Sequence, residues 1–251
     1  MNEKQMSVLE HIEELRKRLI MVVVFFFIAV IGGFFLARPL ILYLQHTHEA
    51  EQFALNAFKP TDPLMVYMQF AFIIAFVLTS PVILYQLWAF ISPGLYPTER
   101  RVTLSYIPIS IGLFLLGISF SYFVLFPFVI EFVIQISNDL GINQVIGINE
   151  YFRFLLQLTL PFGLLFQLPV VVMFLTRLGI ITPMLLVKIR KYAYFALLVI
   201  AALITPPELI SHLMVTVPLF ILYEVSIFIS RFSYRKALLS QMKEANENGV
   251  D

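Results

Sequence analysis

The sequence contains no cysteine and carries little charge of either sign. Without Cys, the chain has no disulfide framework, no thiolate metal site and no cysteine nucleophile. Charged residues make up 13% of the chain, roughly half of their usual share in a soluble domain. Lys and Arg exceed Asp and Glu by only one residue, so the strongly basic face that nucleic acid requires is missing. These absences exclude disulfide-stapled and nucleic-acid-binding proteins.

Sequence motifs of several enzyme classes are also missing. There is no GxxxxGK[ST] run that would cradle the phosphates of ATP, and no HExxH pattern that would hold a catalytic zinc. The four histidines lack the spacing of a metal site; they are His11, His46, His48 and His212. We therefore expect no metal, no cofactor and no enzymatic activity.

Apolar residues, by contrast, are abundant. They make up 60% of the chain, and the mean hydropathy is +0.88. This is more than a core can bury, so the outer surface must be apolar too and must face a bilayer. Six apolar runs are candidate membrane spans: 19–37, 67–90, 102–130, 152–178, 192–204 and 209–228. We expect an all-α, polytopic membrane protein with six transmembrane helices.

The last two helices are expected to be short. The fifth run has thirteen residues, which cover only about 20 Å as a helix. The sixth is interrupted by Pro218 and Glu224. Other prolines in or beside the spans should bend the helices into a concave bundle; they are Pro81, Pro108, Pro127, Pro161 and Pro169. A bilayer thinned around helices five and six would accommodate their length.

The basic residues predict the orientation. Fourteen of the seventeen Lys and Arg residues lie before the first span, after the last span or between alternate spans, all on one predicted side. Only Arg38, Lys59 and Arg153 lie on the other side. Because basic loops stay in the cytoplasm, both termini should be cytoplasmic. The predicted organisation is a cytoplasmic amphipathic helix (1–18), a single transmembrane domain (19–228) and a partly disordered cytoplasmic tail (229–251).

The N-terminal helix has two faces. Val8, Ile12, Leu15 and Leu19 recur at helical spacing and form an apolar stripe for lipid or for the bundle. The charged side chains opposite should face water; they are Glu10, Glu13, Glu14 and Lys17, with His11 and Arg18 beside Glu14. The ordinary interpretation is two i,i+4 ion pairs, Glu13–Lys17 and Glu14–Arg18, each worth about 0.2–0.5 kcal/mol.

A second polar cluster, FISPGLYPTERR, occupies residues 90–101 between the second and third spans. Pro93 and Gly94 indicate a turn, and Pro97 suits the first turn of the following helix. Glu99 then lies near the positive end of that helix. A carboxylate there gains about 0.3–1 kcal/mol from the helix dipole, which is reason enough for a glutamate.

Five segments together resemble the TatC subunit of the twin-arginine protein translocase. They are HIEELRKRL (11–19), SPVILYQLWAFISPGLYPTERR (80–101), SYFVLFPFV (121–129), FQLPVVV (166–172) and LITPPELIS (203–211). The resemblance covers nearly the whole chain. It implies a receptor in the cell membrane that binds the twin-arginine signal peptides of folded cargo. It also implies assembly with TatA-type single-span subunits, with or without a TatB-type subunit, and with other copies of itself. Export would be driven by the proton motive force.

The resemblance also implies which residues bind. The twin arginines would contact Glu14 and Glu99, and Phe90 would belong to the same patch. Further members of the predicted signal-peptide site are Arg16, Pro93, Leu95, Tyr96 and Arg100. The chemistry fits, because a guanidinium is planar, permanently charged and bidentate toward carboxylates, whereas a lysine ammonium is a point charge.

Three polar residues of the spans complete the candidates. Members of this family usually have a glutamate where this chain has Gln167, so a mechanism that needs charge there is in doubt, although an amide can hydrogen-bond a partner helix. Glu208 is a candidate for partner-helix docking; the plainer interpretation is a solvated loop acid. Glu224 is predicted to lie near the cytoplasmic interface or to pair with a basic neighbour. A small secondary transporter is the alternative function, but the sequence has no two-fold repeat.

Overall fold

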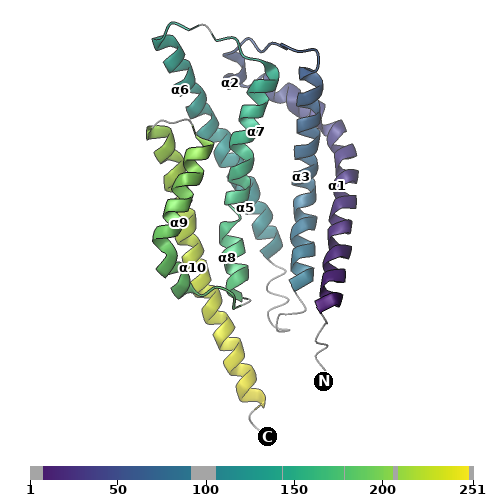
Figure 1. Cartoon of the computed structure of the whole chain (residues 1–251), viewed down its shortest axis with the longest axis vertical. Coiled ribbons are helices and arrows are strands. Elements are labelled where there is room, and N and C mark those ends of the chain that lie inside the picture. The colour runs from purple at the N-terminus through teal and green to yellow at the C-terminus, as the bar shows by residue number, and fades with distance from the viewer. Residues whose placement is uncertain (1–7, 92–105, 143, 178, 206–208, 249–251) are drawn as a thin grey trace. The chain divides into compact units, whose positions relative to one another are not determined.

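The computed structural model describes residues 8–91, 106–142, 144–177, 179–205 and 209–248 (Figure 1). These residues form helices, with one isolated β-bridge between Asn56 and Gly147. The elements in chain order are α1 (Val8–Gln45), α2 (His48–Glu51), α3 (Asp62–Ile91), α5 (Tyr106–Phe120), the π-helical turn η2 (Ser121–Leu125), α6 (Phe126–Asp139), α7 (Ile148–Leu165), α8 (Leu168–Arg177), α9 (Pro183–Ile204) and α10 (Leu209–Asn248). The predicted all-α class is confirmed.

Five helical stretches of the described chain are long and apolar enough to cross a membrane. They are Ile12–Gln45, Asp62–Phe90, Ile107–Asp139, Ile148–Arg177 and His212–Arg235. The fifth predicted span lies in α9, which is long enough but carries Lys188, Arg190 and Lys191 in its first half. Six crossings therefore remain a prediction that depends on α9.

The helices extend beyond the apolar runs that predicted them. The expected N-terminal helix and the first span are one helix, α1, of 38 residues. The expectation of two short final helices is wrong for the helices as wholes, because α9 has 22 residues and α10 has 40. The segment expected to be a partly disordered tail is helical through Asn248. Apolar runs mark only what hydrocarbon covers, and a helix continues through polar residues on either side.

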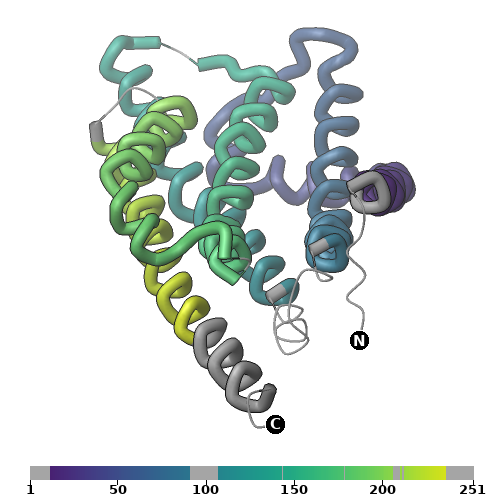
Figure 2. The backbone as a smooth tube through the Cα atoms, turned by 60° about the horizontal axis from the view of Figure 1, so that its bottom comes forward, coloured from purple at the N-terminus to yellow at the C-terminus, as the bar shows by residue number. Residues whose placement is uncertain are grey.

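The described contacts group the chain into two compact units, the first containing residues 1–95 and 145–150. In this unit α1 and α3 lie side by side, as Figures 1 and 2 both show. Both helices carry buried small residues: Ala29, Gly33 and Ala37 on α1, and Ala71 and Ala75 on α3. A Cβ at Gly33 would collide with the backbone carbonyl of Ala71. The two backbones therefore approach closely, as is common where helices pack in lipid.

The second unit contains residues 96–144 and 151–251. Here α5 and α7 also pack through glycines: a Cβ at Gly117 would lie 2.6 Å from the Phe162 carbonyl oxygen, and one at Gly163 would lie 2.8 Å from the Phe114 ring. The π-helical turn η2 ends two residues before Pro127. Because proline lacks an N–H and its ring crowds the carbonyl four residues earlier, a widened turn is a natural accommodation. Pro169 follows the break between α7 and α8 for the same reason.

Candidate functional site

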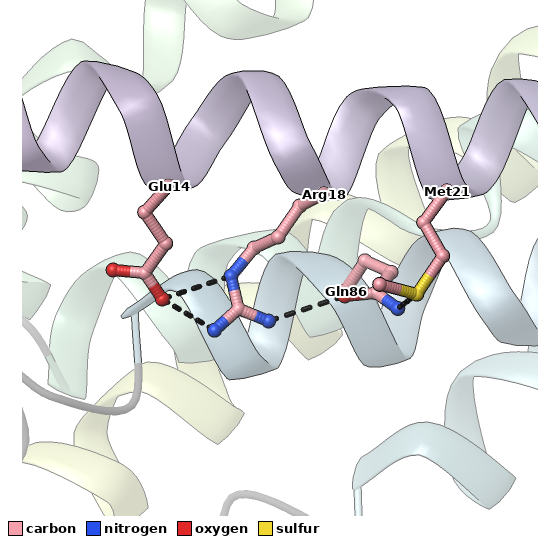
Figure 3. Close-up of polar contacts among 4 residues, drawn as sticks. All are labelled: Glu14, Arg18, Met21 and Gln86. Atoms are coloured by element: carbon pink, nitrogen blue, oxygen red, sulfur yellow. Dashed lines mark hydrogen bonds and ion pairs between the residues drawn. The ribbon is translucent and has the colours of Figure 1, made fainter.

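Glu14 lies on α1 in a half-buried polar cluster that faces α3 (Figure 3). Its Oε1 accepts hydrogen bonds from Arg18, from Nε at 3.0 Å and from Nη2. Its Oε2 is buried and has no hydrogen-bond partner in the described part of the chain. The side chains of Glu14 and Arg18 are only 19% and 23% exposed. One oxygen of this carboxylate thus accepts two hydrogen bonds, while the other accepts none from the described residues.

Gln86 of α3 holds Arg18 in place. Arg18 Nη1 donates to Gln86 Oε1 at 3.1 Å, and Gln86 Nε2 contacts Met21 Sδ at 2.8 Å (Figure 3). Gln86 is buried, so its amide must be satisfied by protein groups. The chain Glu14–Arg18–Gln86 therefore links α1 to α3 and fixes the direction of the Glu14 carboxylate.

The two predicted ion pairs are confirmed, but the predicted orientation of the helix is partly wrong. Glu13 and Lys17 pair at 3.0 Å and are exposed, as expected. Glu14 and Arg18 face α3 instead of water. Three members of the apolar stripe, Ile12, Leu15 and Leu19, are exposed. The side of α1 that carries the small residues packs on α3. The apolar stripe is therefore left exposed and available to lipid.

The remaining residues predicted for this site are only partly described. Phe90 lies on α3 one turn beyond Gln86 and on the same side of the helix, and it is half-buried. Arg16 is exposed on α1. The other predicted members lie outside the described residues: Pro93, Leu95, Tyr96, Glu99 and Arg100. Glu208 lies outside them as well.

Gln167 joins two helices of the second unit. It lies at the break between α7 and α8, and its Nε2 donates to the Ser110 carbonyl oxygen of α5 at 3.0 Å. Its Oε1 accepts from the Ser110 hydroxyl. The amide thus donates to and accepts from one residue of the neighbouring helix. An uncharged side chain can therefore join the two helices at this position.

Glu224 pairs with a basic neighbour, one of the two possibilities open from the sequence. Its Oε2 accepts from Arg190 Nη2 at 2.9 Å, and its Oε1 accepts from the Tyr194 hydroxyl. Both partners lie on α9, so the cluster ties α9 to α10. Sequence reasoning missed Tyr194, although its position four residues after Arg190 places both side chains on one face.

Long apolar helices joined by paired polar side chains make this chain a multi-pass membrane protein. In the described residues, no group of three or more His, Asp or Glu side chains could hold a metal ion. Residues 10–218 match the family model of the Sec-independent protein translocase protein TatC. The chain belongs to the TatC family. It is accordingly a protein translocase component, a membrane transport subunit and not an enzyme.

Relatives support this assignment over nearly the full length. The chain is 73% identical to the Sec-independent protein translocase protein TatCy of Bacillus subtilis, over 94% of this chain and 93% of that protein. It is 63% identical to TatC of Halalkalibacterium halodurans over the same shares. A crystal structure of the twin arginine translocase receptor TatC matches with a TM-score of 0.76 at 34% identity, over 89% of this chain and 99% of that one.

Proposed function

We propose that this chain is the receptor for twin-arginine signal peptides, and that Glu14 and Glu99 bind the two arginines. The observation that carries the proposal is the Glu14 carboxylate: it is half-buried and oriented by Arg18, and its Oε2 lacks a hydrogen-bond partner among the described residues. A buried acceptor without a donor costs about 1–3 kcal/mol, so a visiting donor would be favoured.

An arginine suits this acceptor better than a lysine. A guanidinium presents several N–H groups in a plane and can bond a carboxylate while its remaining donors reach a second acceptor. Arg18 already demonstrates the geometry on the other oxygen of the same carboxylate. Glu99 is the proposed partner for the neighbouring arginine, and Phe90, on the same side of α3 as Gln86, would contact the peptide beside them.

The wider proposal concerns topology and assembly. The chain would lie in the cytoplasmic membrane, with α9 as the sixth crossing. Both termini would then lie in the cytoplasm. TatA-type subunits, with or without a TatB-type subunit, and further copies of this chain would form the passage, with the proton motive force as the energy source. The twin arginine translocase receptor among its structural neighbours supports this role.

The test is the binding of a fluorescent twin-arginine signal peptide, and of its Lys-Lys version, to the purified full chain in nanodiscs. The variants are Glu14→Gln, Glu99→Gln and the double variant. Each lost charge-assisted hydrogen bond should cost about 1.5–3 kcal/mol, so we expect roughly ten- to a hundredfold weaker binding for each single variant. Glutamine keeps an acceptor for Arg18, so the variants should fold.

Glu13→Gln is the matched control. Glu13 is adjacent in sequence but exposed and paired with Lys17, so its loss should leave peptide affinity unchanged. Equal affinity for the arginine and lysine peptides, or an equal loss in the Glu13 and Glu14 variants, would contradict the proposal.

A further inference from the structure

An amphiphilic groove lies between α9 and α10 in the second unit. Its volume is about 890 Å³. Its apolar lining includes Met184 and Val187 of α9 and Phe228 and Phe232 of α10, and three of these side chains are strongly exposed: Met184 at 83%, Phe228 at 72% and Phe232 at 59%. The groove is thus large and apolar enough to take part of an acyl chain.

Three cations border the same groove: Lys188, Arg231 and Arg235. All three are exposed, and none has an ion-pair partner within the described residues. The side chains described on α9 and α10 include one carboxylate, Glu224, and it is bonded to Arg190 and Tyr194. Among the described side chains, the groove therefore has three positive charges and no carboxylate to balance them.

Helical spacing places these cations beside the apolar residues. On α10, Phe228, Arg231, Phe232 and Arg235 follow at i, i+3, i+4 and i+7, so they share one face. On α9, Met184, Val187 and Lys188 do the same. The cations also lie where the apolar part of each helix meets its polar end. In a bilayer, the phosphate groups of the lipids lie at this level.

We propose that this groove is a binding site for an anionic phospholipid of the cytoplasmic leaflet. The phosphate would lie against Lys188, Arg231 and Arg235, and an acyl chain would lie along Met184, Phe228 and Phe232. Basic pockets between transmembrane helices on the cytoplasmic side recognise such headgroups. The assignment to the cytoplasmic leaflet rests on the orientation given under the proposed function. The groove and its charges do not depend on that orientation.

Native mass spectrometry of the full chain in detergent tests the site. Either dioleoyl phosphatidylglycerol or dioleoyl phosphatidylcholine is added at equal concentration, and the lipid retained is counted. We expect phosphatidylglycerol to be retained in preference to phosphatidylcholine. Removing each cation should weaken its retention roughly fivefold, so Lys188→Gln/Arg231→Gln/Arg235→Gln should abolish the preference.

The matched control is Arg38→Gln/Lys59→Gln/Arg153→Gln, which removes the same charge from positions outside the groove. It should retain phosphatidylglycerol as the unsubstituted chain does. The proposal would be overturned by the absence of a preference for phosphatidylglycerol, or by an equal loss in both triple variants. It would also be overturned if inorganic phosphate displaced bound phosphatidylglycerol as effectively as added lipid does, because that would indicate a simple anion site.

The same preparations are titrated with the twin-arginine peptide. If the groove variant loses the lipid and still binds the peptide, the two sites are independent. If the lipid result fails while Glu14→Gln still weakens peptide binding, only the lipid proposal is lost.

Discussion

At the scale of single residues, neutral and charged polar groups have distinct positions in this chain. Glu14 and Glu224 each pair with an arginine, whereas the Gln167 side chain bonds Ser110 and no charged residue among those described. An uncompensated charge in hydrocarbon costs at least about 2.5–3.5 kcal/mol, while an amide costs less and still needs partners. None of the described hydrogen bonds of the Gln167 side chain involves a cation. A neutral amide therefore suits this contact between two helices.

Replacement of Gln167 should destabilise the chain. Gln167→Leu removes both bonds to Ser110, and Gln167→Glu replaces the donor that faces the Ser110 carbonyl oxygen with an acceptor. We expect each to cost about 1–3 kcal/mol, seen as a lower apparent melting temperature in detergent by size-exclusion chromatography. Ser110→Ala should add little to Gln167→Leu, because the shared interaction is already lost. Full additivity of the two would contradict the pairing.

The sequence predicted the polar partners better than their directions. Both i,i+4 pairs on α1 follow from spacing alone, but whether Glu14 faces water or α3 depends on which side of α1 packs. A signal for that side was present: Ala29, Gly33 and Ala37 recur every four residues. Arg18 and Gln86 could not be paired from the sequence, because their contact joins two helices that are far apart along the chain.

At the scale of helices, small residues determine how closely neighbours approach. Gly33 faces the Ala71 backbone, whereas Gly32, one residue earlier, has no heavy atom near its added Cβ. This adjacent pair separates the effect of packing from the effect of helix propensity.

Gly33→Ala should therefore destabilise the contact between α1 and α3. The added methyl has to push two backbones apart, which costs roughly 1–3 kcal/mol. Gly32→Ala should be neutral or stabilising by up to about 1 kcal/mol, because alanine favours the helix. Apparent melting temperatures in detergent measure both. Equal effects of the two substitutions would mean that the close approach is not needed.

Helix ends were the least predictable part of the fold. The fifth apolar run begins at Tyr192, yet α9 begins at Pro183, where Thr182 caps it by accepting from the Leu185 N–H at 3.3 Å. Threonine followed by proline is typical of a helix start, and this local signal could have placed the boundary. The count of apolar residues instead started the predicted helix after Lys188, Arg190 and Lys191. A helix near a membrane surface readily carries such cations, so the true start lies before them.

At the scale of the whole chain, the absence of cysteine makes the topology directly testable. Single cysteines can replace the exposed Lys17, Phe58, Leu140 and Arg235. In intact cells, a membrane-impermeant maleimide should label positions 58 and 140, while 17 and 235 should react only after lysis. Six crossings place 17 and 235 on the same side, and five would place them on opposite sides. Labelling of 235 but not 17 in intact cells would thus remove α9 from the membrane.

The bridge between Asn56 and Gly147 has a consequence for biosynthesis. Asn56 N–H donates to the Ile146 carbonyl oxygen at 3.1 Å, and the Ile148 N–H donates to the Asn56 carbonyl oxygen at 2.8 Å. Residues 145–150 thereby complete the first compact unit, although chain belonging to the second unit precedes and follows them. The first unit cannot be finished until residue 150 has left the ribosome. Until then, only the contact between α1 and α3 stabilises this pair in the bilayer, while the insertion machinery is already inserting later helices.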